Sequence, residues 1–182
     1  MSERRQSPDN LVWLDLEMTG LDAKRDVILQ AAVIITDGEL SPLESLVLDI
    51  WQPDEALERM VPFVREMHEK TGLLARVRAS TVDLRSAQER LLAPIAGLCT
   101  YPATLCGNSV GTDKRFLERW MPAVAGYLHY RILDVSSLKL VAQRFYGPDA
   151  AFTKPTDREH DALFDIQNSI AELAHYRKTI LR

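Results

Sequence analysis

The segment "NLVWLDLEMTG", residues 10–20, places two carboxylates inside what reads as a buried β-strand. The residues before Asp15 are mostly apolar, Glu17 follows two positions later, and Gly20 ends the segment. Side chains alternate along a strand, so residues i and i+2 share a face. Asp15 and Glu17 are therefore expected to point the same way. Like charges this close, partly out of water, repel and raise each other's pKa.

Two interpretations of this pair are open. An edge strand with one wet face would leave both acids in solvent, but the apolar neighbours and the Gly20 break weigh against it. The other interpretation is a divalent cation. Mg²⁺ and Mn²⁺ prefer carboxylate oxygens, so a bound ion would replace the repulsion by coordination. The pair therefore predicts a metal site.

Other acids stand where they could complete such a site. Asp113 lies where a loop gives way to a helix in "LCGNSVGTDKRF", although an interaction with the helix dipole also explains an acid there. Asp161 and Asp165 lie at i and i+4 near one face of the last expected helix. One of them could cap the helix while the other binds metal, and spacing does not decide which. His160 precedes them, and beside carboxylates its pKa can lie near neutrality, as acid–base catalysis requires.

Length and composition set the class of protein. A chain of 182 residues with 46% hydrophobic residues fits one domain, 1–182, for which we expect a flexible tail over residues 1–9. No apolar run is long enough to span a membrane, and the polar first ten residues do not resemble a secretory signal. Cys99 and Cys106 are too few for a disulfide framework. We therefore expect a cytoplasmic protein.

The net charge limits the partners. It is −4, from 22 Lys and Arg against 26 Asp and Glu. A protein that grips long nucleic acid usually carries a basic excess, so a long nucleic acid is not expected as a partner. A small anionic substrate held by a metal stays compatible with this charge.

Hydrophobic patterns and turn signals give an alternation of strands and helices. β-Branched runs and the Asp-Gly turn at 37–38 indicate three antiparallel strands at the start of the chain. Later strands alternate with amphipathic helices, which suits a mixed sheet covered by helices. The expected strands are 11–17, 27–37, 43–50, 103–108 and 130–134, and the expected helical segments are 54–80, 83–98, 112–121, 135–147 and 160–178.

Four stretches together resemble one enzyme family. "WLDLEMTGLD", "CGNSVGTDKRFL", "HYRILDVSSLK" and "HDALFDI" are similar to motifs of the oligoribonucleases, members of the DEDD-type exonucleases in the subgroup with a catalytic histidine. The resemblance runs from about residue 11 to 178. Glu-Met-Thr-Gly-Leu-Asp is more specific than a bare Asp-x-Glu. The resemblance implies an α/β, ribonuclease-H-like fold with a five-stranded mixed sheet flanked by helices.

The resemblance also implies an activity and the roles of particular residues. The expected reaction is 3′–5′ hydrolysis of very short RNA, dinucleotides included, to nucleoside 5′-monophosphates. His160 would be the general base, and the family pattern selects Asp165 over Asp161. Two divalent ions, Mg²⁺ or Mn²⁺, would be held by Asp15, Glu17, Asp113 and Asp165.

Substrate residues follow from the same resemblance. Leu21 corresponds to a wedge between the two bases, although it could also be a turn residue that packs inward. Phe63 stands where the family usually has tryptophan. Tyr130 corresponds to a residue contributed across a homodimer, so a homodimer is expected. The residues that correspond to a cap on the 5′ phosphate are His68, Ser109, Arg131 and Ser136; for Arg131 a surface ion pair is the alternative.

Some positions depart from the family pattern. Gln30 replaces an acid, Val64 replaces asparagine, Phe164 replaces the acid before Asp165, and the loop before His160 is longer than usual. Two other functions stay open at this point: an exonuclease of the same class that acts on longer RNA or DNA, and a non-catalytic module that binds nucleotides.

Overall fold

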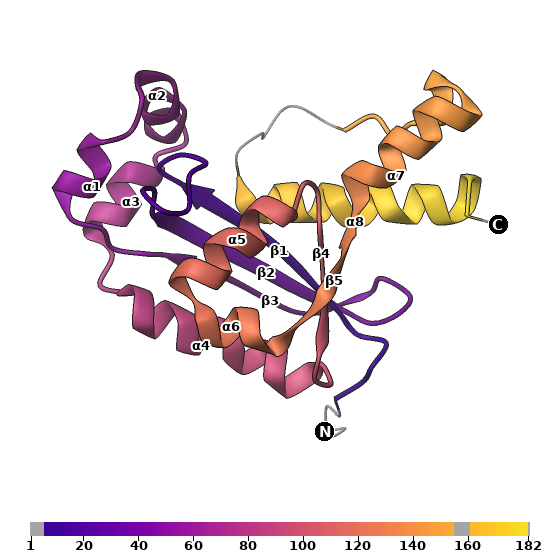
Figure 1. Cartoon of the computed structure of the whole chain (residues 1–182), viewed down its shortest axis with the longest axis horizontal. Helices are drawn as coiled ribbons and strands as arrows, with labels where there is room; N and C mark the ends of the chain where they lie inside the picture. Colours follow the sequence, from indigo (N-terminus) through magenta and orange to yellow (C-terminus); the bar gives the residue numbers. More distant parts are fainter. Residues whose placement is uncertain (1–5, 155–160, 182) are drawn as a thin grey trace.

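The computed structural model describes residues 6–154 and 161–181, and a five-stranded sheet forms its centre (Figure 1). The strand order is β3-β2-β1-β4-β5. The first three strands pair antiparallel, whereas β4 is parallel to β1 and to β5. The α/β, ribonuclease-H-like sheet expected from the sequence is confirmed. The strands are β1 Leu11–Met18, β2 Ile28–Thr36, β3 Pro42–Asp49, β4 Ala103–Gly107 and β5 Leu128–Asp134.

Helices flank this sheet, close to the expected positions. Three short helices stand at one end of it, where a single segment over 54–80 was expected to be helical in pieces (Figure 1). The helices are α1 Asp54–Glu58, α2 Pro62–Lys70, α3 Leu73–Ala79, α4 Leu84–Leu98, α5 Gly111–Trp120, α6 Pro122–Tyr127, α7 Val135–Val141 and α8 Ala162–Thr179, and α7 runs on into π-helical turns at Ala142–Tyr146.

The two faces of the sheet have separate cores, and this separation decides where the acids of β1 point. Val12, Leu14 and Leu16 pack on the face covered by α4, α5 and α6. Trp13 packs on the opposite face, with side chains of α7 and α8. Because side chains alternate along a strand, Asp15 lies on the Trp13 face and looks toward α8.

Two prolines act differently in their helices. Pro94 leaves α4 unbroken to Leu98, since Leu91 and Ile95 on either side of it are fully buried against the sheet. Pro122 begins α6, a position that suits a residue without a backbone N–H.

The expectation of a flexible tail over residues 1–9 is wrong for the part that the structure describes. Ser7 forms a parallel bridge with Cys99. Its N–H donates to Leu98 O at 3.0 Å, and its carbonyl accepts from Thr100 N at 3.3 Å. Backbone pairing of this kind orders a segment whose polar composition alone predicts flexibility. Residues 1–5 lie outside the described part of the chain.

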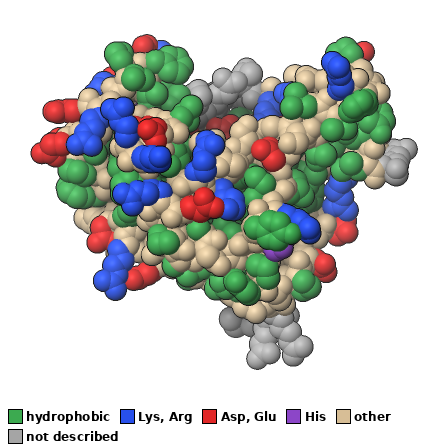
Figure 2. All heavy atoms as spheres, in the orientation of Figure 1, with side chains coloured by type: hydrophobic (Ala, Val, Ile, Leu, Met, Phe, Trp, Pro, Cys, Tyr) green, Lys and Arg blue, Asp and Glu red, His purple; other side chains and the backbone are tan. Residues whose placement is uncertain are grey.

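Over residues 6–154 and 161–181, no helix is long and apolar enough to cross a membrane. The outline of the molecule is notched between the α1–α3 end and α7, and acidic side chains are visible in the notch (Figure 2).

Candidate active site

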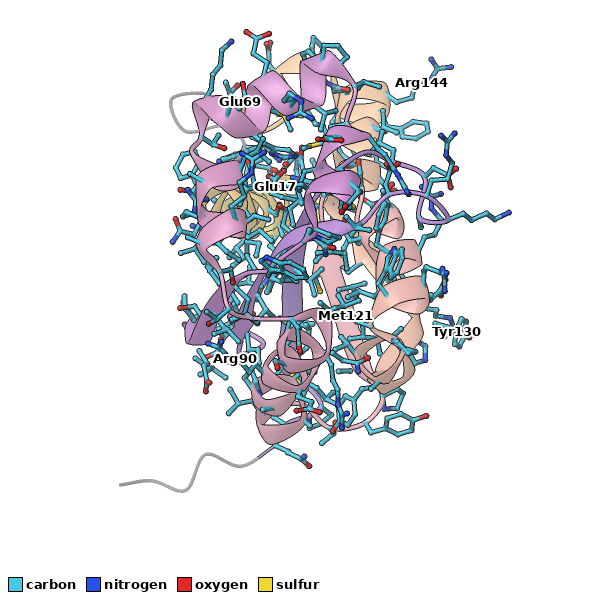
Figure 3. All side chains as sticks on the ribbon, turned by 90° about the vertical axis from the view of Figure 1, so that its left-hand side faces the viewer. Glu17, Glu69, Arg90, Met121, Tyr130 and Arg144 are labelled. Atoms are coloured by element: carbon cyan, nitrogen blue, oxygen red, sulfur yellow. The ribbon has the colours of Figure 1, made fainter. Side chains whose placement is uncertain are left out.

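Three carboxylates meet where β1 faces the start of α8. One oxygen from each of Asp15, Glu17 and Asp165 lies within 4.8 Å of the others. The first two share a face of β1, as the i, i+2 spacing predicts, and Asp165 is in the first turn of α8. Glu17 is labelled in Figure 3, where it lies in the interior of the molecule.

Asp113, in the first turn of α5, is tied to the same strand. Its Oδ1 accepts a hydrogen bond from Leu16 N at 3.0 Å, and its side chain is buried. This N–H needs a partner because the pairing of β4 with β1 ends at Cys106 opposite Trp13. Gly107 follows, and a Cβ there would lie 3.0 Å from Leu14 O, so glycine lets the end of β4 come close to β1.

Burial and mutual repulsion raise the pKa of these acids. Desolvation, followed by the charges of Asp165 and Asp113, raises the pKa of Glu17 from 4.5 to about 8. Desolvation raises the pKa of Asp113 from 3.8 to about 7, although its hydrogen bond from Leu16 N acts in the opposite direction. For Asp15, desolvation and then Asp113 push the pKa well above its ordinary value. The cluster is thus unstable as a set of bare charges.

The start of α8 assigns different places to the two aspartates that the spacing could not distinguish. Asp161 is the N-cap, and its side chain accepts from Phe164 N at 3.3 Å. Asp165 joins the carboxylate cluster instead. His160, expected to be the general base, lies outside the described residues.

The structure does not bring His68 to an open surface, in contrast to its expected place in a phosphate cap. It is fully buried in α2. Its Nε2–H donates to Met18 O at 2.9 Å, and its Nδ1 lies 3.9 Å from Glu17 Oε2. In this structure His68 therefore supports the end of β1 and the Glu17 carboxylate.

Ser109 and Ser136 do come together, at the start of α7. Ser109 N donates to Ser136 Oγ at 3.0 Å and to Asp134 Oδ1 at 2.9 Å, and the two hydroxyls lie 3.2 Å apart. Ser109 has φ 52°, a left-handed conformation that Asp134 stabilises by accepting its N–H. The pair offers two hydroxyls at one point.

Tyr130 and Arg131 lie on β5, the edge strand, and Arg131 covers the Tyr130 ring at 5.1 Å. Tyr130 projects outward at the margin of the molecule, away from Glu17 (Figure 3). These two residues are therefore separated from the carboxylates of their own chain.

Leu21 and Phe63 are both 75% exposed, so the alternative of an inward-packed Leu21 is wrong. The turn before β2 that carries Leu21 is held by Asp26, which accepts from Thr19 Oγ1 at 3.2 Å and from Asp22 N at 2.9 Å. An exposed leucine on a fixed turn is available to a ligand.

Gln30 shows how one departure from the family pattern is accommodated. It lies opposite Glu17 in the β1–β2 pairing, is buried, and donates to Asp49 Oδ1. A neutral amide here adds no further negative charge to the cluster.

Sequence reasoning missed Glu172, which is fully buried in α8. A signal was present, because Asp165, Ser169, Glu172 and Tyr176 recur at i, i+4, i+7 and i+11 and so share one helical stripe. A charged residue on a stripe that is otherwise turned inward marks a buried polar network.

The donor set fits a hard divalent cation. Carboxylate oxygens are the ligands that Mg²⁺ and Mn²⁺ prefer, and three of them converge here. A cation would also remove the repulsion that raises the pKa values of the cluster. Divalent metal binding is therefore the chemistry that this arrangement supports.

Comparison with known proteins agrees with this geometry. The sequence profile of a family described as Exonuclease matches residues 12–173. An oligoribonuclease from Mycobacterium sp. (strain KMS) is 47% identical over 175 residues, which cover 94% of this chain and 81% of that protein. An oligoribonuclease from Pseudomonas aeruginosa is 45% identical over 179 residues, which cover 97% of this chain and 99% of that protein.

Solved structures share the fold. The zinc-bound complex of Escherichia coli ExoI with single-stranded DNA superposes with a TM-score of 0.74 at 18% identity, covering 97% of this chain and 42% of the ExoI chain. The chain thus spans less than half of that larger protein, and at this identity the likeness concerns the fold. On the sequence profile and the close relatives, the chain belongs to the exonuclease family and, within it, to the oligoribonucleases.

Proposed function

We propose that this protein is a 3′–5′ exoribonuclease that hydrolyses very short RNA, dinucleotides included, to nucleoside 5′-monophosphates. The observation that carries the proposal is the convergence of three carboxylates within 4.8 Å, on a chain 45–47% identical to oligoribonucleases over nearly its full length. The catalytic unit is taken to be the whole chain, 1–182, as one domain.

The cluster supplies the metal site in this proposal. Asp15, Glu17, Asp113 and Asp165 would hold two divalent ions, Mg²⁺ or Mn²⁺. Bound ions would make a water acidic enough to react near neutral pH and would offset negative charge on the phosphate. Asp113 keeps its Oδ1 on Leu16 N, which leaves Oδ2 for a ligand role.

His160 moves the proton. One imidazole nitrogen takes a proton from the attacking water, whose oxygen forms the new bond to phosphorus. The bond between phosphorus and the 3′ oxygen breaks, and that oxygen leaves with the upstream nucleoside and gains a proton. The 3′-terminal residue departs as a nucleoside 5′-monophosphate.

Substrate length would be set by groups at both ends of a short pocket. Ser109 and Ser136 present hydroxyls for a 5′ phosphate. Leu21 and Phe63 present exposed apolar surface to the bases. A dinucleotide offers few phosphates, so the acidic net charge of −4 does not prevent binding.

A homodimer would complete this pocket. Tyr130 and Arg131 lie on the edge strand β5, and Tyr130 projects away from Glu17, so a second copy of the chain could reach them (Figure 3). The Arg131 guanidinium is permanently charged and planar, which suits a phosphate. We place the enzyme in the cytoplasm, since both cysteines are free and buried.

The test is a length series of 5′-labelled RNAs, from a 2-mer to a 20-mer, with Mg²⁺, with Mn²⁺ and with EDTA. The proposal expects metal-dependent turnover that is fastest on the shortest RNA, and 5′-monophosphate products. A preference for the 20-mer would favour an exonuclease for longer strands. Equal turnover by wild type and Asp113→Ala would point to a contaminating nuclease and a non-catalytic chain.

A further inference from the structure

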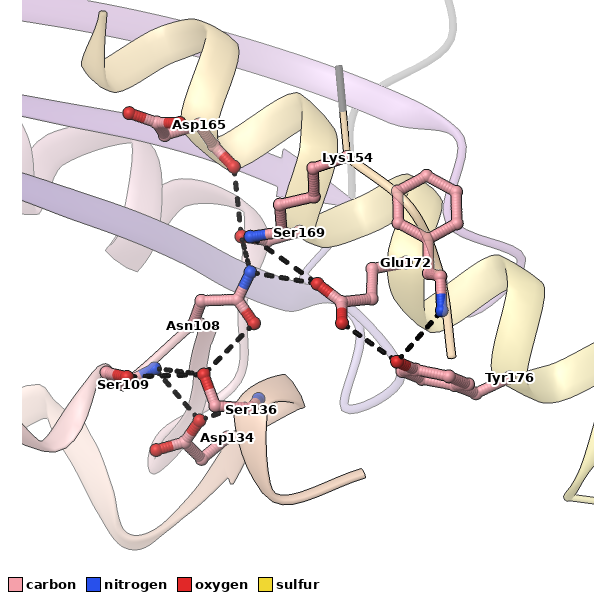
Figure 4. Close-up of polar contacts among 10 residues, drawn as sticks. Asn108, Ser109, Asp134, Ser136, Lys154, Asp165, Ser169, Glu172 and Tyr176 are labelled. Atoms are coloured by element: carbon pink, nitrogen blue, oxygen red, sulfur yellow. Dashed lines mark hydrogen bonds and ion pairs between the residues drawn. The ribbon is translucent and has the colours of Figure 1, made fainter. Parts of the chain in front are cut away.

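Glu172, in the middle of α8, is a fully buried carboxylate that the proposed chemistry does not use. A buried charge is costly unless it is paired and hydrogen-bonded. Three groups from different parts of the chain meet it (Figure 4). They are Tyr176 OH, which donates to Oε1 at 2.9 Å, and Asn108 Nδ2 and Lys154 Nζ, which lie 3.1 Å and 3.4 Å from Oε2.

The Asn108 contact leads toward the two serines. Asn108 follows β4 directly, and its Oδ1 accepts from Ser136 Oγ at 3.3 Å. Its Nδ2 also donates to Ser169 Oγ at 3.0 Å. Glu172 therefore fixes the amide orientation that presents Oδ1 to Ser136, the partner of Ser109 (Figure 4).

The Lys154 contact leads toward the carboxylate cluster. The Lys154 side chain is 30% exposed, and its Nζ lies against the fully buried Glu172 carboxylate. Glu172 lies seven residues, about two helical turns, beyond Asp165 on the same stripe of α8. Glu172 thus fixes the Lys154 ammonium on the stripe of α8 that supplies Asp165 to the cluster.

Ser169 links the Asn108 branch to the backbone of Asp165 on α8. Its hydroxyl donates to Asp165 O at 2.9 Å and accepts from Asn108 Nδ2 (Figure 4). The stripe of α8 that supplies the cluster with Asp165 therefore also carries Ser169 and Glu172, which Asn108 Nδ2 contacts together.

We propose that Glu172 is a positioning residue for the reaction, whose carboxylate holds the Lys154 ammonium on the stripe of α8 that carries Asp165 and holds Asn108 beside the serine pair. This inference rests on the proposed function. An ammonium acts as a compact point charge, and Lys154 in this position offers a fixed positive charge to the phosphodiester that enters the site. Glu172 would then act through Lys154 and Asn108.

The first test compares dinucleotide turnover by wild type, Glu172→Gln, Lys154→Met and the double variant. Each single change is expected to lower kcat by about 10- to 100-fold, the range found for residues that support a metal site from outside it. The double variant should lose no more than the more impaired single variant, because the two residues act together. Lys154→Arg keeps the charge and should recover most of the rate.

A binding measurement separates this role from a structural one. Removal of a positive charge near the acids should tighten Mn²⁺ binding by Lys154→Met about two- to fivefold, as loss of a weak ion pair implies, even as kcat falls. A merely structural lysine would leave the Mn²⁺ affinity unchanged. Calorimetric titration of the RNA-free protein gives this readout without turnover.

The Arg85–Glu89 ion pair provides the matched control, because it is exposed and lies on α4, the helix that covers the other face of the sheet. Arg85→Met and Glu89→Gln should leave kcat and Mn²⁺ affinity unchanged. Circular dichroism shows whether Glu172→Gln folds. If it does not fold, the kcat and the Mn²⁺ affinity of Lys154→Met test the proposal.

Wild-type rates in both single variants, or fully additive losses in the double variant, would overturn the positioning role and leave the proposed function intact. Absence of dinucleotide turnover by the wild type would overturn the proposed function and this inference with it.

Discussion

The Oδ1 of Asp113 lies 3.0 Å from the backbone N of Leu16, the residue between Asp15 and Glu17. A side chain from α5 thus fixes the strand segment that carries two acids of the cluster. The same contact explains how residues nearly a hundred positions apart in the sequence form one site. Asp113 therefore has a structural role, as the acceptor for Leu16 N, that can be tested separately from the role of its charge in metal binding.

Asp113→Asn keeps an oxygen acceptor for Leu16 N but removes the charge. We expect dinucleotide turnover to fall by at least about 100-fold, which is more than the loss from residues that support a metal site without binding the metal. The free energy of unfolding in EDTA should be equal to or above that of the wild type. Asp113→Ala also removes the acceptor and should lose about 1 kcal/mol relative to Asp113→Asn. Urea unfolding and a turnover assay check both, and activity in Asp113→Asn near that of wild type would exclude a ligand role.

The raised pKa values predict that the metal-free protein loses stability as pH rises. Glu17 and Asp113 hold protons in the folded state up to pH values of about 8 and about 7, whereas their ordinary pKa values are 4.5 and 3.8. Between these limits the folded chain binds more protons than the unfolded chain, so its free energy of unfolding falls with increasing pH.

Thermal melts in EDTA from pH 5 to pH 8 measure this effect. The expected decline in Tm is about 2–4 °C for each kcal/mol lost, and Mn²⁺ should abolish most of it at pH 8. Metal affinity should rise over the same interval, because bound protons must leave first. A Tm in EDTA that rises toward pH 8 would contradict the assignment.

His68 should act on metal binding rather than on a substrate phosphate. His68→Ala leaves Met18 O and Glu17 without this side chain, so Mn²⁺ affinity and turnover should both fall, by about 10- to 100-fold. The loss should be equal for dinucleotides with and without a 5′ phosphate, and His68→Gln, which keeps a donor, should recover part of it. A loss confined to the 5′-phosphorylated substrate would instead restore the phosphate-cap role.

His160 is expected to matter for chemistry alone. His160→Ala should lower kcat by about 10²- to 10⁴-fold, the usual contribution of a general base. Its Mn²⁺ affinity should stay at the wild-type value, as measured by titration. Full activity in this variant would transfer the proton-accepting role to another group.

Mixing two inactive variants tests the dimer. In a mixed dimer, the Arg131→Ala subunit keeps its own Asp113. It can receive Arg131 from the Asp113→Asn subunit, so one of the two pockets would be intact. Random exchange of a twofold dimer should restore about a quarter of wild-type activity. If the activity of the mixture equals the mean of the two separate variants, Arg131 contributes to the pocket of its own subunit or to no pocket.

Local patterns predicted most of the fold. The β-branched runs and the Asp-Gly turn at 37–38 placed the first three strands within about two residues. The sequence missed the pairing of Ser7 with Cys99, because a contact across ninety positions leaves no local signal. A proline at position 94 does not indicate from sequence alone whether α4 continues, because the packing on the sheet that carries α4 past it is not visible in the sequence.

The candidate site was predictable only where local patterns determine the direction of a side chain. Alternation along β1 put Asp15 and Glu17 on one face, and the structure adds that this face meets α8. Spacing alone left Asp161 and Asp165 equivalent, and cap geometry distinguishes them. The burial of His68 depends on how α2 packs against the end of β1, which no sequence pattern describes.

The most direct test of the account is anomalous diffraction from crystals soaked in Mn²⁺. We expect anomalous peaks among the oxygens of Asp15, Glu17, Asp113 and Asp165, about 4 Å apart if two ions bind together. Carboxylates turned away from one another, with no anomalous peak between them, would contradict the proposed metal centre and the hydrolysis that depends on it.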